Sequence, residues 1–411
     1  MSDRKKSIVF TPGRIGQLEI KNRLVRSSTF EQAATEKGEV SDALIGLHCN
    51  LAKGGVGLIL TGIAWVYTNI PAPPLMMRAD NDSFIEGMKR LTSSVHKAVT
   101  DCKIMLQLHH PGRQVISNLS DYERVASFYP PAYKTYALKH PEIAGNTHAP
   151  HYMEAIAPSA IYDTLFQRTP RALQLEEIDK IIDDYANGIR RAKESGFDGA
   201  QLHAAHGWLL SLFLSPRTNQ RDDIYGGSTE NRTRIVREII RRARKFVGDN
   251  FPILIKLNTT DFLPGGIDID EAIRIGKILS DAGFDALEAS GGMWESMKRS
   301  QQELKWVPVI LPESRTGIKT SDQEAYFLPG AKALKDNTQA KIISVGGYRS
   351  FNVIESALAC GVTDFISLSR PLVRQPELPM LWKTGGTDKA ECVSCNACLP
   401  IGTSIIACRA K

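Results

Sequence analysis

The chain of 411 residues is 42% hydrophobic and 23% charged, an ordinary balance for a globular protein that argues against disorder. The formal net charge is +6. We find no run of five basic residues and no interleaving of arginine with aromatic residues, so nucleic acid is not an expected partner. The excess of positive charge suits an anionic ligand such as a phosphate.

The N-terminal sequence MSDRKKSIVF is charged but lacks the apolar segment of a signal peptide. The longest apolar run, VGLILTGIAWV at 56–66, has about half the length that a membrane helix needs. We therefore expect a cytoplasmic protein with no membrane partner.

Short apolar segments recur along the chain, and they lack a clean alternation of polar and apolar residues. Such segments are typical of strands that are buried on both faces of a parallel sheet. The sequence predicts eight strands, at 24–30, 56–63, 103–109, 199–205, 253–258, 285–291, 341–347 and 364–370.

Helical patterns fill the intervals between these strands. The segment at 41–55 begins with Ser41 as a candidate N-cap and ends on glycine, and the apolar residues of 175–197 fall on one helical face. The segments at 268–284 and 350–361 are also helical in pattern. Repeated strand-then-helix units predict an α/β fold, a (β/α)8 TIM barrel. A doubly wound sheet is the alternative, but no GxGxxG motif follows the first strand.

Two long segments interrupt this rhythm: 111–172, which is rich in proline and tyrosine, and 207–230, which is dense in turn-forming residues. Both follow strands, so we expect rim insertions at the C-terminal end of the barrel, where barrel enzymes build their active sites. We expect the barrel to span residues 1–385, with a cysteine-rich extension at 386–411.

The stretch LHAAHGWLL at 202–210 places His203 near the end of the fourth strand and His206 just beyond it. If the strand ends here and Gly207 bends the chain, the two imidazoles converge over the barrel mouth. A packing role is the alternative for each histidine, but a pair at a strand's exit favours function. A metal would need a third ligand, which is not close in sequence. Two N–H donors would instead polarise a carbonyl or stabilise an enolate.

Four of the seven cysteines lie near the C-terminus, with spacings of two, two and nine residues: Cys392, Cys395, Cys398 and Cys408. Four thiolates can hold a 4Fe–4S cluster or a zinc ion. The tight C-x2-C-x2-C start favours the iron–sulfur cluster, while zinc and unligated thiols remain alternatives. We expect the other three cysteines, Cys49, Cys102 and Cys360, to be small core residues.

The block HAAHGWLLSLFLSPRTNQRDDIYGGSTENRTR resembles the signature of the old yellow enzyme family of FMN-dependent ene-reductases. Five further segments match that family in the expected order along roughly residues 8–380. They are IGQLEIKNRLVRSS, LAKGGVGLILTG, QLHHPGR, SVGGYRS and SLSRPLVRQPELP.

This resemblance implies a flavoprotein site for FMN. Gln107 would hydrogen-bond the flavin pyrimidine with its amide, and Lys256 would lie near flavin N1 and O2, where the reduced ring carries negative charge. A structural ion pair is the alternative role for Lys256. The resemblance also implies that Ser27, Ser28 and Thr29 line the flavin. It places the phosphate among Gly346, Gly347, Ser369 and Arg370.

The resemblance further implies that NADH or NADPH donates a hydride through FMN to the β-carbon of an α,β-unsaturated carbonyl, an enone or enoyl thioester. His203 and His206 would bind the carbonyl oxygen. Two residues depart from the family pattern. Trp208 stands where tyrosine usually donates the α-carbon's proton, and an indole cannot ionise to do so. Phe30 stands where cysteine, threonine or histidine often lies near the flavin.

The cysteine tail resembles the branch of the family that contains 2,4-dienoyl-CoA reductase and trimethylamine dehydrogenase, in which a cluster follows the barrel. In those relatives the chain continues beyond the cluster into a second, nucleotide-binding half. For the present sequence we expect an electron-transfer partner protein instead, or a cluster that is only structural. We also expect a homo-oligomer. Two other interpretations remain: a Schiff-base lyase that uses Lys256, and a flavin or iron–sulfur electron-transfer subunit.

Overall fold

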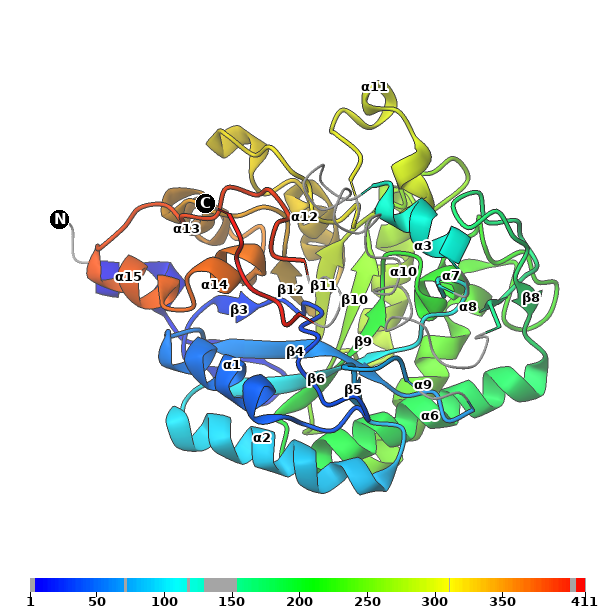
Figure 1. Ribbon diagram of the computed structural model, residues 1–411, viewed down its shortest axis with the longest axis horizontal. Helices are drawn as coiled ribbons and strands as arrows, with labels where there is room; N and C mark the ends of the chain where they lie inside the picture. The colour runs from blue at the N-terminus through cyan, green and yellow to red at the C-terminus, as the bar shows by residue number, and fades with distance from the viewer. Residues whose placement is uncertain are drawn as a thin grey trace.

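The computed structural model describes residues 4–69, 72–116, 119–128, 154–309, 311–399 and 404–410. At its centre lies a barrel of parallel strands (Figure 1): β3 (Leu24–Arg26), β4 (Leu58–Trp65), β6 (Lys103–His109), β9 (Gly199–Ala204), β10 (Ile253–Asn258), β11 (Ala286–Ser290), β12 (Lys341–Ser344) and β13 (Phe365–Leu368). The barrel is closed because β3 pairs with both β13 and β4. Each strand overlaps one of the eight predicted segments, so the predicted TIM barrel is confirmed.

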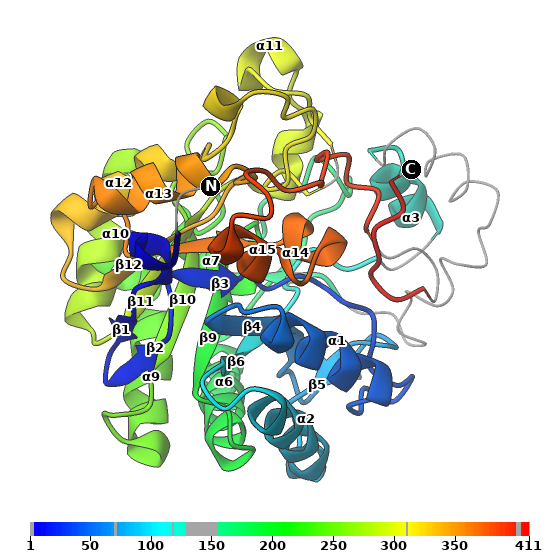
Figure 2. The ribbon, with the colours of Figure 1, turned by 90° about the vertical axis from the view of Figure 1, so that its left-hand side faces the viewer.

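Helices surround the barrel (Figures 1 and 2). The four segments with the clearest helical pattern form α1, α6, α10 and α13, and the Ser41 side chain accepts a hydrogen bond from the Leu44 N–H at the start of α1, as predicted. The outer helices are α1 (Asp42–Lys53), α2 (Ile85–Ala98), α6 (Leu175–Glu194), α9 (Arg234–Val247), α10 (Ile269–Asp281), α12 (Leu328–Asn337), α13 (Phe351–Ala359) and α15 (Leu378–Thr384).

Shorter elements lie in the connections. The short helices are α3 (Leu119–Ala126), α7 (Leu209–Leu214), α8 (Thr229–Arg232), α11 (Gln301–Leu304) and α14 (Arg370–Arg374), with 3-10 turns at η1 (Arg4–Lys6), η2 (Ile8–Phe10), η3 (Asp82–Phe84), η4 (Trp294–Lys298) and η5 (Ser321–Gln323). The short strands are β1 (Gly13–Ile15), β2 (Leu18–Ile20), β5 (Met77–Arg78), β7 (Ile156–Ala157) and β8 (Arg171–Ala172).

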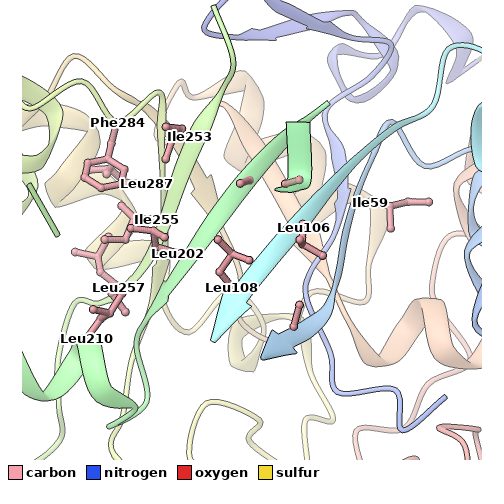
Figure 3. Packing of buried hydrophobic residues seen from close by; sticks show 14 of the residues in the cluster. Ile59, Leu106, Leu108, Leu202, Leu210, Ile253, Ile255, Leu257, Phe284 and Leu287 are labelled. Atoms are coloured by element: carbon pink, nitrogen blue, oxygen red, sulfur yellow. The ribbon is translucent and has the colours of Figure 1, made fainter. Parts of the chain in front are cut away.

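The main apolar core lies between the strands and the helices. Outward-facing side chains such as Leu106, Leu108, Leu202, Ile255 and Leu257 are fully buried and pack together in this layer (Figure 3). Burial of each such side chain contributes about 1.5–3 kcal/mol. The strands are therefore covered on their outer face, which explains why their sequences lack polar alternation.

A second, smaller core fills the N-terminal end of the barrel. The β1–β2 hairpin supplies Ile15 and Ile20, which pack against the inward-facing Val25, Leu254 and Phe365. This apolar plug closes the N-terminal end, and ligands of TIM-barrel enzymes bind at the opposite, C-terminal end of the strands.

The predicted insertions follow the C-terminal ends of β6 and β9, and they touch where the Gln220 N–H donates to Ser159 Oγ at 2.9 Å. Residues 129–153 of the first insertion and 400–403 of the cysteine tail lie outside the described residues. In the part of the chain that the structure describes, no helix is both long and apolar enough to span a membrane.

The expectation that the remaining cysteines are core residues is correct for Cys102, which is buried, and wrong for Cys360, which is exposed. Cys360 is the C-cap of α13, and the turn that follows a helix on the outside of a barrel faces water. Cys49 is partly buried on α1.

Candidate active site

A cavity that is open to solvent lies at the C-terminal end of the barrel, where TIM-barrel enzymes build their active sites. Residues from β4, β6, β9, β10, β11 and β13 line it, together with the loops that follow the barrel strands. The sequence-predicted site residues that line this one cavity are Ser27, Ser28, Thr29, Gln107, His203, His206, Lys256, Gly346, Gly347, Ser369 and Arg370.

A polar layer forms the floor of the cavity directly above the apolar plug. Because strand side chains alternate with a period of two, the residue two positions after a plug residue also points inward, as Lys256 follows Leu254 and Gln107 follows Met105. Glu288 follows Ala286 in the same way. The inward-pointing residues of these strands are therefore apolar in the plug and polar one step further along, and this polar step forms the floor.

The floor residues form one hydrogen-bonded network. Lys256 Nζ lies 3.2 Å from Glu288 Oε1 and 3.1 Å from Ser27 Oγ. The Ser27 hydroxyl donates to Glu288 Oε1 at 2.8 Å and the Gln201 amide donates to Glu288 Oε2 at 2.9 Å. Gln107 Nε2 in turn donates to Gln201 Oε1 at 2.7 Å.

Burial raises the pKa of Glu288, but the charge of Lys256 and the hydrogen bonds from Gln201, Ser27 and Lys256 outweigh it, so the pKa lies below its ordinary value. A buried carboxylate is tolerated here because it is paired and fully hydrogen-bonded. The network holds Gln107 and Lys256 at defined positions beneath the cavity.

A turn of two glycines, Gly346 and Gly347, lines another part of the cavity. Gly346 and Gly347 have φ values of 126° and 77°, a region that favours glycine. A Cβ at Gly347 would lie 2.6 Å from Ile318 and Tyr326 side chains. Ser369 Oγ lies 2.7 Å from Thr29 Oγ1, and both residues line the same cavity as the glycine turn.

His203 and His206 lie side by side at the cavity wall, with ring centroids 5.1 Å apart and planes at 88°. Strand β9 ends at Ala204, and both His206 and Gly207 then adopt left-handed φ values of 63° and 81°. The His206 N–H donates to Asn258 Oδ1 at 3.0 Å, which fixes the turn. The expected convergence of the two imidazoles is therefore present, and His206 shares the bend with Gly207.

Both imidazoles are neutral. Burial lowers the pKa of His203 well below its ordinary value, and His206, His109 and Lys256 lower it further. Burial and Lys256 likewise hold the pKa of His206 well below its ordinary value. Each ring therefore keeps one N–H donor.

The contacts of the two rings indicate where these N–H donors lie. His203 Nδ1 accepts from the Ala205 N–H at 3.4 Å, which leaves the proton on Nε2. His206 Nε2 lies 2.7 Å from Ser290 Oγ. When the serine hydroxyl donates to that nitrogen, the His206 proton is on Nδ1.

Trp208 and Phe30, the two departures from the family pattern, both line the cavity. The Trp208 ring packs edge-on against the rings of His109 and Trp294, with distances between ring centroids of 4.5 Å and 5.3 Å. Its neighbours are therefore mostly rings, and it gives this side of the cavity an aromatic wall.

Several residues of the site were not anticipated from the sequence. Gln201 and Glu288 carried a usable signal, because each is a polar residue in the middle of a buried strand. Glu313 and Tyr326 also line the cavity, but they lie in irregular loops without a motif, and only the folded chain shows that they reach the site. Arg349 lines it as well and falls in the matched segment SVGGYRS, where it was not singled out.

The four tail cysteines line a second, smaller cavity, with Arg374, Glu391 and Asn396 among its other residues. Arg370 lines both cavities and donates to Asn396 Oδ1 at 2.6 Å. Within the described ranges, no group of three His, Cys, Asp or Glu side chains is arranged to hold a single metal ion. The cysteine tail is nevertheless tied to the main site, because Ser394 lines the main cavity.

Comparison with known proteins gives a consistent result. The family model described as "NADH:flavin oxidoreductase / NADH oxidase family" matches residues 8–388. The chain is 33% identical to an NADH oxidase from Thermoanaerobacter brockii over 94% of its own length and 52% of that protein. It is 30% identical to an NADH-dependent flavin oxidoreductase from Talaromyces variabilis, covering 88% of this chain and 83% of that protein.

Among solved structures, a complex of 2-naphthoyl-CoA reductase with 2-naphthoyl-CoA matches with a TM-score of 0.75 and 26% identity, over 95% of this chain and 54% of that one. The chain spans about half the length of several curated relatives that it matches. The family model covers the whole barrel together with every residue that lines the polar floor and the histidine wall. The chain therefore belongs to the NADH:flavin oxidoreductase / NADH oxidase family.

Proposed function

We propose that this protein is an FMN-dependent oxidoreductase that takes a hydride from NADH or NADPH and reduces the C=C bond of an α,β-unsaturated carbonyl compound. The observation that carries the proposal is the pair of neutral imidazoles, His203 and His206, beside a floor formed by Gln107 and Lys256. Family membership supports the flavin and the nicotinamide donor.

The residues of the cavity fit FMN. Two buried hydroxyl oxygens of cavity-lining residues, Ser28 Oγ and Ser367 Oγ, have no hydrogen-bond partner within the described chain, and buried polar atoms normally require one. A flavin in this position would face the amide of Gln107 and the cation of Lys256. Its phosphate would suit the turn at Gly346 and Gly347, with the guanidinium of Arg370 nearby.

When bound, FMN supplies hydride transfer between the nicotinamide and the substrate. The chain's own part is to bind the substrate's carbonyl oxygen. His203 Nε2–H and His206 Nδ1–H are two donors at the same wall, and they would stabilise the negative charge that develops on that oxygen as the β-carbon accepts a hydride.

Two findings bear on the substrate class. The cavity opens to solvent, so a substrate attached to a large carrier could leave the carrier outside. The relative solved with 2-naphthoyl-CoA binds a thioester of this kind. Enoyl thioesters and simple enones are therefore both candidate substrates, and the histidine pair suits the carbonyl of either.

The proposal is tested with the purified protein reconstituted with FMN. We expect the two absorption bands of a flavin, bleaching by NADH or NADPH under anaerobic conditions, and their return when 2-cyclohexen-1-one or crotonyl-CoA is added. A well-folded protein that binds no FMN would contradict the proposal. So would bound FMN that NAD(P)H reduces but neither acceptor reoxidises.

The Schiff-base lyase interpretation is less well supported. Lys256 Nζ lies within hydrogen-bond distance of Glu288 and Ser27, so its ammonium group is held by partners rather than free to attack a carbonyl. Borohydride trapping with a carbonyl substrate is expected to leave Lys256 unmodified.

We further propose that Cys392, Cys395, Cys398 and Cys408 hold a 4Fe–4S cluster. The four thiols surround one cavity, and each cysteine of such a cluster binds a different iron, so the sulfurs stand further apart than around one zinc ion. Anaerobic purification followed by iron and sulfide analysis tests this, with four irons per chain expected. Stoichiometric zinc, or metal-free thiols after cluster reconstitution, would contradict it. With the cluster, transfer of electrons to a partner protein becomes a second candidate function.

A further inference from the structure

The proposed reduction requires a proton as well as a hydride, and the family's usual tyrosine is replaced by Trp208. An indole N–H does not ionise in the working pH range. The proton must therefore come from another side chain or from water. Among the described residues that line the cavity, those with ionisable side chains are His203, His206, Lys256, Glu313, Tyr326, Tyr348, Arg349 and Arg370.

Most of these groups are engaged elsewhere. The Tyr326 hydroxyl donates to the Glu313 backbone carbonyl at 2.7 Å, and the Tyr348 hydroxyl lies 2.8 Å from Ser344 Oγ. Lys256 lies in its ion pair with Glu288. The guanidinium groups are too weakly acidic for proton transfer at neutral pH, and the neutral histidines are required as donors to the substrate oxygen.

Glu313 is the exception. Its Oε1 lies 3.6 Å from His206 Nδ1, the atom to which we assign a substrate-facing proton. Its Oε2 is shielded from water and has no hydrogen-bond partner within the described residues. The side chain is only 19% exposed. A carboxyl oxygen in this setting is expected to carry a proton, because an unpaired buried anion is costly.

The loop that carries Glu313 is firmly anchored. The Arg315 guanidinium lies over four aromatic rings, those of Phe262, Trp306, Tyr326 and Phe327, at 4.4–5.8 Å from the ring centroids. The Tyr326 hydroxyl also accepts a hydrogen bond from the Arg315 N–H at 3.3 Å. Because Tyr326 binds the backbone on both sides of Ser314, the Glu313 carboxyl has a defined position beside His206.

We propose that Glu313 is the general acid that protonates the α-carbon of the substrate, in place of the missing tyrosine. This inference rests on the proposed ene-reductase function. As the β-carbon gains the hydride that originates from NAD(P)H, the π electrons of the C=C bond move onto the carbonyl oxygen held by the histidine pair. The enolate's α-carbon then takes the carboxyl proton of Glu313, and solvent reprotonates the resulting carboxylate.

The charges around Glu313 agree with this role. Burial raises the pKa of Glu313 to about 7, against the lowering effect of a backbone hydrogen bond and of Lys256 and Arg370. The other groups that face it are His206, which is neutral, and Tyr326. A general acid works best when its pKa lies near the operating pH. The protonated form is the active one, so substrate reduction should slow as the pH rises through about 7.

The test uses Glu313→Gln holoenzyme, with Glu176→Gln on the exposed start of α6 as the matched control. Flavin reduction by NAD(P)H needs no proton from Glu313 and should be unchanged in both. Reoxidation by 2-cyclohexen-1-one should fall about 100-fold or more in Glu313→Gln, as expected for loss of a general acid, and should lose its dependence on pH near 7. An unchanged reoxidation rate with the wild-type pH profile would overturn the inference.

Two further measurements separate acid catalysis from simple damage. Adding Trp208→Tyr to Glu313→Gln restores a phenolic donor, so the double variant should reoxidise at least tenfold faster than Glu313→Gln alone. Infrared difference spectra of the wild-type holoenzyme should show a carboxyl band that titrates near pH 7 and is missing in Glu313→Gln. If that band is absent from wild type between pH 5 and 6, Glu313 is not the acid, even if the variant fails to fold. If wild type is not reoxidised by any unsaturated carbonyl, the proposed function itself fails.

Discussion

The ammonium nitrogen of Lys256 lies 3.2 Å from the carboxylate of Glu288, on the neighbouring strand at the same register position, with both side chains almost completely buried. This pair forms the floor of the cavity in which we place the flavin. Charges buried this deeply stay in a protein only when each compensates the other. A substitution that breaks this ion pair should therefore lower the stability of the barrel and disturb the cavity floor at the same time.

Substituting Glu288→Gln should destabilise the protein without bound FMN by about 3–5 kcal/mol, because it leaves the Lys256 cation buried without its counter-charge. Urea unfolding measures this directly, with Glu19→Gln on the exposed face of β2 as the control. A double variant, Glu288→Gln with Lys256→Met, should recover much of the loss. Exposed ion pairs contribute at most about 1 kcal/mol to the free energy of unfolding. A loss below that value in Glu288→Gln would show that Lys256 and Glu288 are not energetically coupled.

The protein should lose stability in mild acid. Burial lowers the folded-state pKa of five histidines, to about 3 for His109 and His110 and well below the ordinary value for His203 and His206, with His48 also lowered. The unfolded chain therefore binds more protons below pH 6.5, so stability is present above that pH and is lost as the pH falls toward the folded-state pKa values. Each such histidine contributes a loss of about 1.4 kcal/mol per pH unit.

Urea unfolding between pH 7.5 and 5.5 checks this, and His109→Gln should make the dependence shallower. The Nδ1 atom of His109 is buried and has no hydrogen-bond partner among the described residues, so the substitution breaks no hydrogen bond at that atom. A stability profile that stays flat from pH 7.5 to 5.5 would mean that these rings do not resist protonation in the folded state.

Removing one donor of the imidazole pair should act on substrate reduction and not on flavin reduction. We expect His203→Ala to slow reoxidation by 2-cyclohexen-1-one about 100- to 1,000-fold, the usual cost of losing one donor to a developing oxyanion. Stopped-flow absorbance separates the two half-reactions. His96→Gln, at a partly exposed position paired with Asp198, is the control. An equal effect of His203→Ala on both half-reactions would place His203 in flavin binding instead.

In the cysteine tail, Cys395→Ser should lower the iron and sulfide content of the protein while FMN binding is retained, because Cys395 lines the tail cavity but not the main one. The exposed Cys360→Ser is the matched control and should keep the wild-type metal content. Equal metal content in both variants would argue against ligation by Cys395.

The sequence by itself determined the barrel and the part of the site that lies on its strands. Apolar segments alternating with helical patterns admit few folds other than a (β/α)8 barrel, and the ends of parallel strands in a barrel necessarily converge. The strand-end position alone pointed to His203, whereas Gln107 and Lys256 were assigned to the same site by the resemblance to the old yellow enzyme family.

Tertiary structure alone decided which groups act together. The partnership of Lys256 with Glu288 depends on the register between two strands, which no single segment encodes. Glu313 reaches His206 because Arg315 is held among aromatic rings from three separate segments. Such loops have no periodic pattern, and their conformation is fixed by contacts between residues distant in sequence. The strands are specified locally by short, mostly apolar segments, whereas the acid beside the histidine pair exists only once the chain has folded around it.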